Sequence, residues 1–416
     1  MKNTTALVLA GGINLGFSVL THNRAKSALP FCGHFRVIDF VLTNLSRSSI
    51  NNVGIIIQYL PGSLIDHVGV GAAWDYASTN RKIKLMPPFV GMGKTEWFRG
   101  SADAIFQNLS YIEDTDADNV LVLSADHIYC MDYKPLADFH RYHNADLTVV
   151  TARRPADCNP QHFGYVTADD SGRVTAFNEK PVTPPHDTVS TGIYLFNAKA
   201  LMATLSQLEN SEIRHDLPSC AVEPMVRDGR VFAYPIQGEW DHLQDLKSYV
   251  KCHARILTGE SRLHPVDHQV VTNLNDRDLG SRPSPYFGRL SNVQDSLISP
   301  GCVVEGTVVR SVLSPGVYVA PNAHVEDCIL FHDVQVHEGV RLHGVISDKD
   351  VTFHPFCKVG EPGQVNLLDP DMHQMTLVGK GAQIVQGVTV GAGKEIQINQ
   401  VVQRDWKTYH ADDEKI

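Results

Sequence analysis

Two adjacent glycines, Gly11 and Gly12, follow the first apolar run of the chain and are the first residues whose placement could do chemistry. Glycines directly after a strand allow backbone N–H groups to approach a phosphate or a base, and Arg24 and Lys26 could supply charge to a triphosphate. A plain strand-to-helix turn would account for the same glycines. The two glycines are therefore compatible with nucleotide binding but do not by themselves establish it.

The elements that would position this loop are short apolar runs, which alternate with longer amphipathic stretches over about the first 250 residues. We expect strands at residues 6–10, 53–57, 120–124 and 147–151. Such continuous apolar runs are typical of a parallel sheet covered by helices, where ligands bind beyond the carboxyl ends of the strands. We therefore predict an α/β, Rossmann-like domain with a mixed, mostly parallel sheet over residues 1–258.

A polar, proline-containing stretch, residues 259–292, predicts a linker, and a different period follows it. Aliphatic residues recur every six positions at Leu313, Val319, Val325, Leu330, Val336 and Leu342, and again at Ile384 and Val390 after an insertion. The second triplet follows the first by 17 residues, close to one turn of a three-sided coil. This pattern predicts a left-handed parallel β-helix of hexapeptide repeats over residues 293–416, with an evenly spaced β-sandwich as the alternative. Such a coil is expected to act as a scaffold and subunit contact, although coils of this kind also host acyltransferases.

Composition narrows the class of protein further. The 416 residues are 43% apolar and 20% charged, which predicts two folded domains. The net charge of −10 argues against nucleic acid and acidic membrane surfaces as partners. The eight cysteines form no CxxC pair, and no apolar run approaches the roughly 20 residues that span a bilayer. We expect a cytoplasmic protein with reduced thiols.

Several further motifs carry a resemblance to a known family. Their order and rough spacing are those of the bacterial ADP-glucose pyrophosphorylases, or glucose-1-phosphate adenylyltransferases. The motifs are FRVIDF at 35–40, QY at 58–59, WFRGSADA at 97–104, ADHIY at 125–129, FGY at 163–165 and EKP at 179–181. The resemblance covers the whole first domain and extends into the repeats.

The resemblance implies a reaction in which glucose 1-phosphate attacks the α-phosphorus of ATP, giving ADP-glucose and pyrophosphate with Mg²⁺. Asp126 matches the family's metal-binding aspartate, and Lys26 and Asp241 are further catalytic candidates. Trp97 and Arg99 resemble residues that shape the nucleotide side. The implied nucleotide contacts are Leu9, Ala10, Gly11, Gly12, Gln58, Gly100 and Asp103; the implied sugar-phosphate contacts are Gly164, Glu179, Lys180, Ser190 and Gly192.

Each of these residues also has a purely structural interpretation. Asp126 could cap a turn, Lys180 could be a solvated surface lysine, and Trp97 could be a core aromatic. The shared register with the family favours the functional interpretation for Asp126 and Lys180.

The glycine-rich loop departs from the family's pattern, Gly-Gly-x-Gly-x-Arg. Asn14 and Gly16 occupy the positions of its last glycine and its arginine. Loss of a preorganised cation aimed at developing charge typically lowers a rate by about 100- to 1000-fold. The altered loop therefore predicts weak catalysis.

A second departure lies at residues 240–249, which align without gaps to the family's Trp-x-Asp-(Ile/Val)-Gly-Thr segment. His242 occupies the position of the second metal-binding aspartate, and imidazole suits Mg²⁺ poorly. Asp241 could replace it only by a slip of one residue, and adjacent strand residues point to opposite faces. His242 itself could be a surface or hydrogen-bonded histidine, a pH-sensitive group or a ligand for a softer metal.

These departures lead to a first hypothesis, a weak or inactive family member that regulates an active paralogue in an oligomer in glycogen or starch-like polymer synthesis. The alternatives are an active adenylyltransferase, or related sugar-phosphate nucleotidyltransferase, and a sensor that only binds metabolites. Family members are typically tetrameric and allosterically regulated, so Arg36 and Lys26 are candidate effector contacts.

Overall fold

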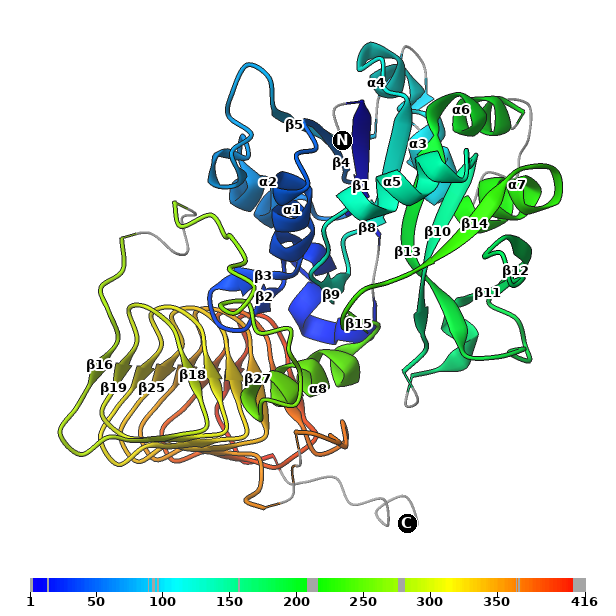
Figure 1. Cartoon of the computed structure of the whole chain (residues 1–416). Helices are drawn as coiled ribbons and strands as arrows, with labels where there is room; N and C mark the ends of the chain where they lie inside the picture. The colour runs from blue at the N-terminus through cyan, green and yellow to red at the C-terminus, as the bar shows by residue number, and fades with distance from the viewer. Residues whose placement is uncertain are drawn as a thin grey trace. The chain divides into compact units, whose positions relative to one another are not determined.

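The computed structural model describes residues 3–12, 15–88, 90–91, 94–95, 97–155, 158–207, 216–275, 281–363, 365 and 367–406. The chain forms two compact units (Figure 1). Unit 1 comprises residues 1–13 and 38–241, and unit 2 comprises residues 14–37 and 242–416. This division differs from the predicted domains, because residues 14–37 pack with the part of the chain that follows residue 241.

Unit 1 contains a nine-stranded sheet in the order β12-β11-β13-β8-β1-β4-β5, and β10 joins it between β13 and β14. Strands β8, β1, β4 and β5 run parallel to one another, whereas β13 is antiparallel to β8 and β10. The strands are β1 Thr4–Leu9, β4 Asn52–Ile56, β5 Lys82–Met86, β8 Asn119–Ser124, β10 Leu147–Arg153, β11 Gly164–Ala168, β12 Val174–Glu179, β13 Thr188–Asn197 and β14 Val231–Pro235. All four strands expected from the apolar runs are present, each shifted by no more than two residues at either end.

Apolar burial on both faces explains why these runs form central strands. Leu7 of β1 belongs to a core cluster with residues of α3, α4 and α6, while Ala6 and Val8 are buried on the opposite face. Figure 1 shows helices on both sides of the sheet. The helices of unit 1 are α1 Val37–Arg47, α2 Gly62–Val68, α3 Ser101–Phe106, α4 Leu109–Asp114, α5 Lys134–Tyr142, α6 Ala198–Ser206 and α7 Glu223–Asp228.

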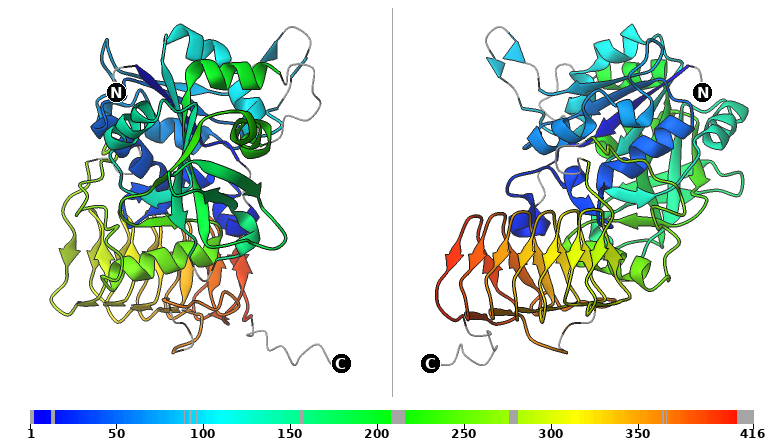
Figure 2. Two further views of the ribbon diagram at one scale, coloured as in Figure 1. Left: turned by 45° about the vertical axis from the view of Figure 1, so that its right-hand side comes forward. Right: turned by 90° about the vertical axis from the view of Figure 1, so that its left-hand side faces the viewer.

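Unit 2 is a left-handed parallel β-helix with the helix α8, Leu246–Leu257, and residues 14–37 (Figure 2). Three parallel sheets form its faces. The first contains β16 Tyr286–Phe287, β19 Val303–Val304, β22 Tyr318–Val319, β25 Gln335–Val336, β28 Thr352–Phe353, β31 Gln383–Ile384 and β34 Val401–Val402. The second contains β17 Asn292–Gln294, β20 Thr307–Val309, β23 His324–Glu326, β26 Arg341–His343, β29 Lys358–Val359 and β32 Thr389–Val390. The third contains β18 Leu297–Ile298, β21 Val312–Leu313, β24 Ile329–Leu330, β27 Val345–Ser347, β30 Thr376–Val378 and β33 Glu395–Ile396.

The register of the coils confirms the six-residue repeat. Leu313 pairs with Leu330, Val319 with Val336, and Val325 with Leu342, and all six side chains are fully buried. Each coil therefore places one aliphatic residue per face into a continuous core. The coil begins earlier than the predicted boundary, because β16 and β17 already pair with β19 and β20.

Residues 14–37 join unit 2 through polar contacts with α8 and the β-helix. Arg24 Nη2 lies 2.8 Å from Asp348 Oδ1 in a buried ion pair, and Cys32 N donates to His253 Nε2 at 3.0 Å. The short strands β2 Pro30–Phe31 and β3 Phe35–Arg36 form a hairpin here. Among the described residues, no helix is long and apolar enough to cross a membrane.

Candidate active site

Asp126 lies in a bend at the carboxyl end of β8, before the short strand β9, His127–Tyr129. Its Oδ1 atom accepts a hydrogen bond from Ser124 Oγ and lies 2.9 Å from His127 Nε2. The Asp126 side chain is partly exposed. The end of a parallel strand is where α/β proteins bind ligands, so Asp126 is placed as the sequence predicts.

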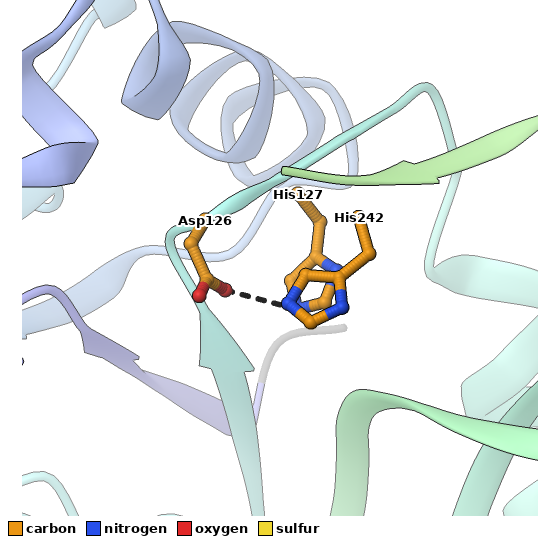
Figure 3. Close-up of side chains that lie close together, drawn as sticks. All are labelled: Asp126, His127 and His242. Carbon is orange, nitrogen blue, oxygen red and sulfur yellow. Dashed lines mark ion pairs between the residues drawn. The ribbon is translucent and has the colours of Figure 1, made fainter. Parts of the chain in front are cut away.

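The strand β15, Trp240–His242, pairs with β9 and brings a third side chain to Asp126. The division between the two units falls within β15, between Asp241 and His242. The Trp240 ring stacks on the His127 ring, with centroids 5.2 Å apart and an interplanar angle of 22°. One ligand atom from each of Asp126, His127 and His242 lies within 4.8 Å of the other two (Figure 3). We call these three residues the Asp126 group.

The Asp126 group offers one carboxylate and two imidazoles. Mg²⁺ prefers near-octahedral coordination by oxygen, with carboxylates, phosphates and water as ligands. Imidazole instead suits zinc and other transition metals. The residues present therefore do not fit Mg²⁺, which the family resemblance implied, and fit a transition metal ion better.

His127 was not predicted as part of this group. It adjoins Asp126 in the sequence, and adjacent residues of a regular strand point to opposite faces. The bend between β8 and β9 removes that restriction. Asp241, proposed as a substitute ligand, does not belong to the group, and its neighbour His242 does.

Gly164 and Glu179 are paired residues of the hairpin formed by β11 and β12. A Cβ atom on Gly164 would lie 2.7 Å from Glu179 Oε2 and 2.5 Å from Phe177 Cζ, so only glycine leaves room for this carboxylate. Burial raises the pKa of Glu179, and Lys180, whose Nζ lies 3.4 Å from Oε1, opposes that rise. The ammonium group of Lys180 is largely exposed, which leaves it accessible to a phosphate.

A bulge in β13 brings the other predicted sugar-phosphate segment next to the Asp126 group. The register between β10 and β13 shifts between Val149 and Thr151, and Gly192 has a φ of 73°. A Cβ atom on Gly192 would lie 3.4 Å from both Ser124 Cβ and His127 Nε2. Ser190 Oγ donates to the Tyr194 hydroxyl at 2.9 Å. Strand β13 therefore forms one wall beside Asp126.

The predicted nucleotide contacts surround the carboxyl end of β1. Ala10 N donates to Ile56 O at 2.9 Å, directly after Leu9, the last residue of β1. A Cβ atom on Gly11 would lie 2.6 Å from Gln58 N, so the close approach of β1 and β4 requires glycine there. Gly12 is exposed, whereas Asn14 lies outside the described residues.

Gln58 and Asp103 hold the segment that contains Trp97. Gln58 Oε1 accepts from Phe98 N at 2.7 Å, and Asp103 Oδ2 accepts from Arg99 N at 3.0 Å. Gly100 precedes α3 and supports this turn. The Trp97 side chain is exposed rather than in the core, so the structural interpretation of this residue is wrong.

Lys26 and Arg36 are buried in unit 2. Lys26 Nζ donates to Leu243 O at 2.7 Å, and Arg36 Nη1 donates to Ala28 O at 2.9 Å. A catalytic or effector role for either residue remains a prediction, and it would require the side chain to exchange these contacts for a ligand.

Comparison with known protein families places both units of this fold. The family described as "Nucleotidyl transferase" matches residues 5–259, and the family described as "GlmU-like, C-terminal hexapeptide" matches residues 286–381.

Curated relatives identify the family within this class of proteins. The chain is 31% identical over 400 residues to the glucose-1-phosphate adenylyltransferase of Desulfitobacterium hafniense (strain Y51), which covers 95% of this chain and 98% of the relative. It is 33% identical over 388 residues to the enzyme of that name from Bacillus thuringiensis (strain Al Hakam), with 91% and 99% covered. The chain therefore belongs to the glucose-1-phosphate adenylyltransferase family.

Proposed function

We propose that this chain is a catalytically weak or inactive member of its family that binds nucleotide and sugar phosphate and regulates an active paralogue in a hetero-oligomer of ADP-glucose synthesis. The observation that carries the proposal is the composition of the Asp126 group, in which two imidazoles accompany a single carboxylate. Such a donor set offers Mg²⁺ a single carboxylate beside two imidazoles that suit it poorly, which weakens the neutralisation of charge on a triphosphate.

The altered glycine-rich loop supports the same conclusion independently. Gly16 stands where the resemblance implies an arginine that stabilises departing pyrophosphate. Lys26 does not substitute for it in the described arrangement, because its ammonium group is buried and donates to Leu243 O. Transition-state stabilisation is therefore weakened in two places.

In contrast to the altered metal ligands and glycine-rich loop, the residues that the resemblance implies for sugar-phosphate binding are all present. Glu179 has the space that Gly164 leaves for it, and Lys180 exposes a cation beside it. Gly192 allows β13 to lie against Ser124 and His127, the residues that flank Asp126. A protein with these features binds substrates without transforming them efficiently, as a regulatory subunit that senses metabolites does.

Pyrophosphate release from ATP and glucose 1-phosphate with Mg²⁺ tests the proposal. The purified chain is compared with an Asp126→Ala variant, which controls for contaminating activity. We expect no turnover above the variant, but a change in the rate or effector response of an active paralogue when the two are mixed. Turnover near one per second that is abolished in the variant would overturn the regulatory role.

The second candidate is an active adenylyltransferase that uses a different metal. The retained Asp126 and the two neighbouring imidazoles favour it, because this donor set suits a transition metal ion. The same assay with Mn²⁺, Co²⁺ or Zn²⁺ in place of Mg²⁺ distinguishes the candidates. Metal-dependent turnover that requires both Asp126 and His242 would establish the second.

A further inference from the structure

A second group of metal-ligating side chains lies on the outer surface of the β-helix, within unit 2. It consists of His324 and Glu326 on β23 and His343 on β26, and we call it the His324 group. The register of these strands places Glu326 opposite His343. Val325 and Leu342 point into the core, so the alternation of the strands directs the three polar side chains outward together.

The distances within the His324 group match those between ligands of one metal ion. Glu326 Oε2 lies 3.1 Å from His324 Nε2 and 3.2 Å from His343 Nδ1, and the three atoms lie within 4.8 Å of one another. Tetrahedral zinc with bonds of about 2.0–2.2 Å separates its ligand atoms by roughly 3.3–3.6 Å. The side chains therefore need to move by only a few tenths of an ångström to hold an ion.

His343 supplies an independent sign of a ligand. Its side chain is 9% exposed, and Nδ1 faces Glu326 Oε2 at 3.2 Å without the geometry of a hydrogen bond. A buried imidazole nitrogen that forms no hydrogen bond costs free energy, and a bound metal ion would remove that cost.

Arg310 orients the Glu326 carboxylate for metal binding. Its Nη2 donates to Glu326 Oε1 at 2.7 Å and its Nε donates to Asp327 Oδ1 at 2.8 Å, which leaves Glu326 Oε2 facing the two imidazoles. Arg310 therefore orients the carboxylate toward the two imidazoles before any ion binds.

We propose that His324 Nε2, Glu326 Oε2 and His343 Nδ1 bind a divalent transition metal ion, zinc by preference. Two histidines and one carboxylate form a known zinc donor set, and the partial exposure of His324 and Glu326 leaves a fourth position for water. The ligands come from two adjacent coils, so the ion links β23 to β26. This site is separate from the Asp126 group and does not depend on the proposed function.

Zinc titration of the full chain by calorimetry tests the proposal, with the absorption spectrum of bound Co²⁺ reporting the ligand geometry. A His242→Ala background removes the Asp126 group as a competing site. Glu326→Gln and His324→Ala each remove one ligand. His337→Ala is the matched control, because His337 also lies in the β-helix but stacks on His354, with ring centroids 5.8 Å apart.

We expect about one zinc per chain, with affinity lowered at least tenfold by Glu326→Gln and by His324→Ala and unchanged by His337→Ala. Zinc should also raise the melting temperature of the background protein and not that of the two ligand variants, because only a bound ion stabilises the fold. Absence of zinc binding at micromolar concentrations, or equal affinity in the ligand variants, would overturn the proposal. If His242→Ala prevents folding, the same variants in the wild-type chain should each lose one bound ion, and retention of every ion would overturn it equally.

Discussion

The Asp126 group and the His324 group contain the same kinds of donor, one carboxylate and two imidazoles, yet the fold assembles them differently. Asp126 follows a strand end in a bend, beside a bulged strand whose glycine leaves space. Glu326 and His343 are opposite residues of two regular strands, and Arg310 holds the carboxylate. Strand ends can be altered by single substitutions and suit substrates, whereas strand register gives a rigid site that suits a structural ion.

Restoring the family's residues in unit 1 should produce the largest effect. Combining Asn14→Gly, Gly16→Arg and His242→Asp returns an oxygen ligand and a cation to the predicted site. We expect pyrophosphate release with Mg²⁺ to rise by about 100-fold or more. Adding Asp126→Ala to the combination should abolish the gain, while zinc binding by the His324 group stays unchanged. An inactive triple variant that still binds ATP would show that other residues limit catalysis.

Loss of a buried ion-pair partner in unit 2 should destabilise the protein far more than loss of an exposed one in unit 1. Arg24→Ala leaves Asp348 buried without its ion-pair partner, and we expect the free energy of unfolding of unit 2 to fall by about 3–5 kcal/mol. Urea denaturation followed by fluorescence measures the change. Arg141→Ala removes an exposed ion pair of unit 1 with Asp138 and should cost no more than about 0.5 kcal/mol. Equal effects of the two substitutions would contradict this contrast.

Acid should destabilise both units through one buried histidine in each. Burial lowers the pKa of His140 in unit 1 and of His253 in unit 2 to about 4, against 6.5 in the unfolded chain. Below pH 6.5 the unfolded state binds more protons than the folded state. The free energy of unfolding is therefore highest above pH 6.5 and falls as the pH is lowered toward 4, by roughly 3 kcal/mol for each histidine.

Denaturation midpoints measured between pH 4 and 7 test this expectation. His140→Gln and His253→Gln should each reduce the pH dependence of the stability of the unit that contains the substitution. His162→Gln, which changes an exposed histidine, should leave both profiles as they are. If the variants at both buried histidines still lose stability steeply in acid, other titratable groups cause the loss.

The smallest expected effect concerns the sugar-phosphate contact. Lys180→Ala should weaken glucose 1-phosphate binding about tenfold, because it removes a charge-assisted hydrogen bond. Calorimetric titration measures the affinity, and Lys199→Ala, an exposed lysine of α6, is the control. Unaltered affinity in Lys180→Ala would remove the main support for substrate binding at Glu179 and Lys180.

The sequence by itself determined the two kinds of architecture, since local repetition encodes both. Apolar runs identified the strands β1, β4, β8 and β10, and the period of six identified the core residues of the β-helix down to their pairing. The matched motifs also identified the family and the strand end at which Asp126 lies. These features need only residues that are near in the chain or that recur at a constant interval.

Tertiary structure alone decided which distant side chains meet. The pairing of β9 with β15 brings His242 to Asp126 across more than a hundred residues, and the bend after β8 adds His127. The packing of residues 14–37 against α8 and the β-helix buries Lys26. No local pattern predicts such contacts, because they depend on strand pairing and on the close packing of segments far apart in the sequence.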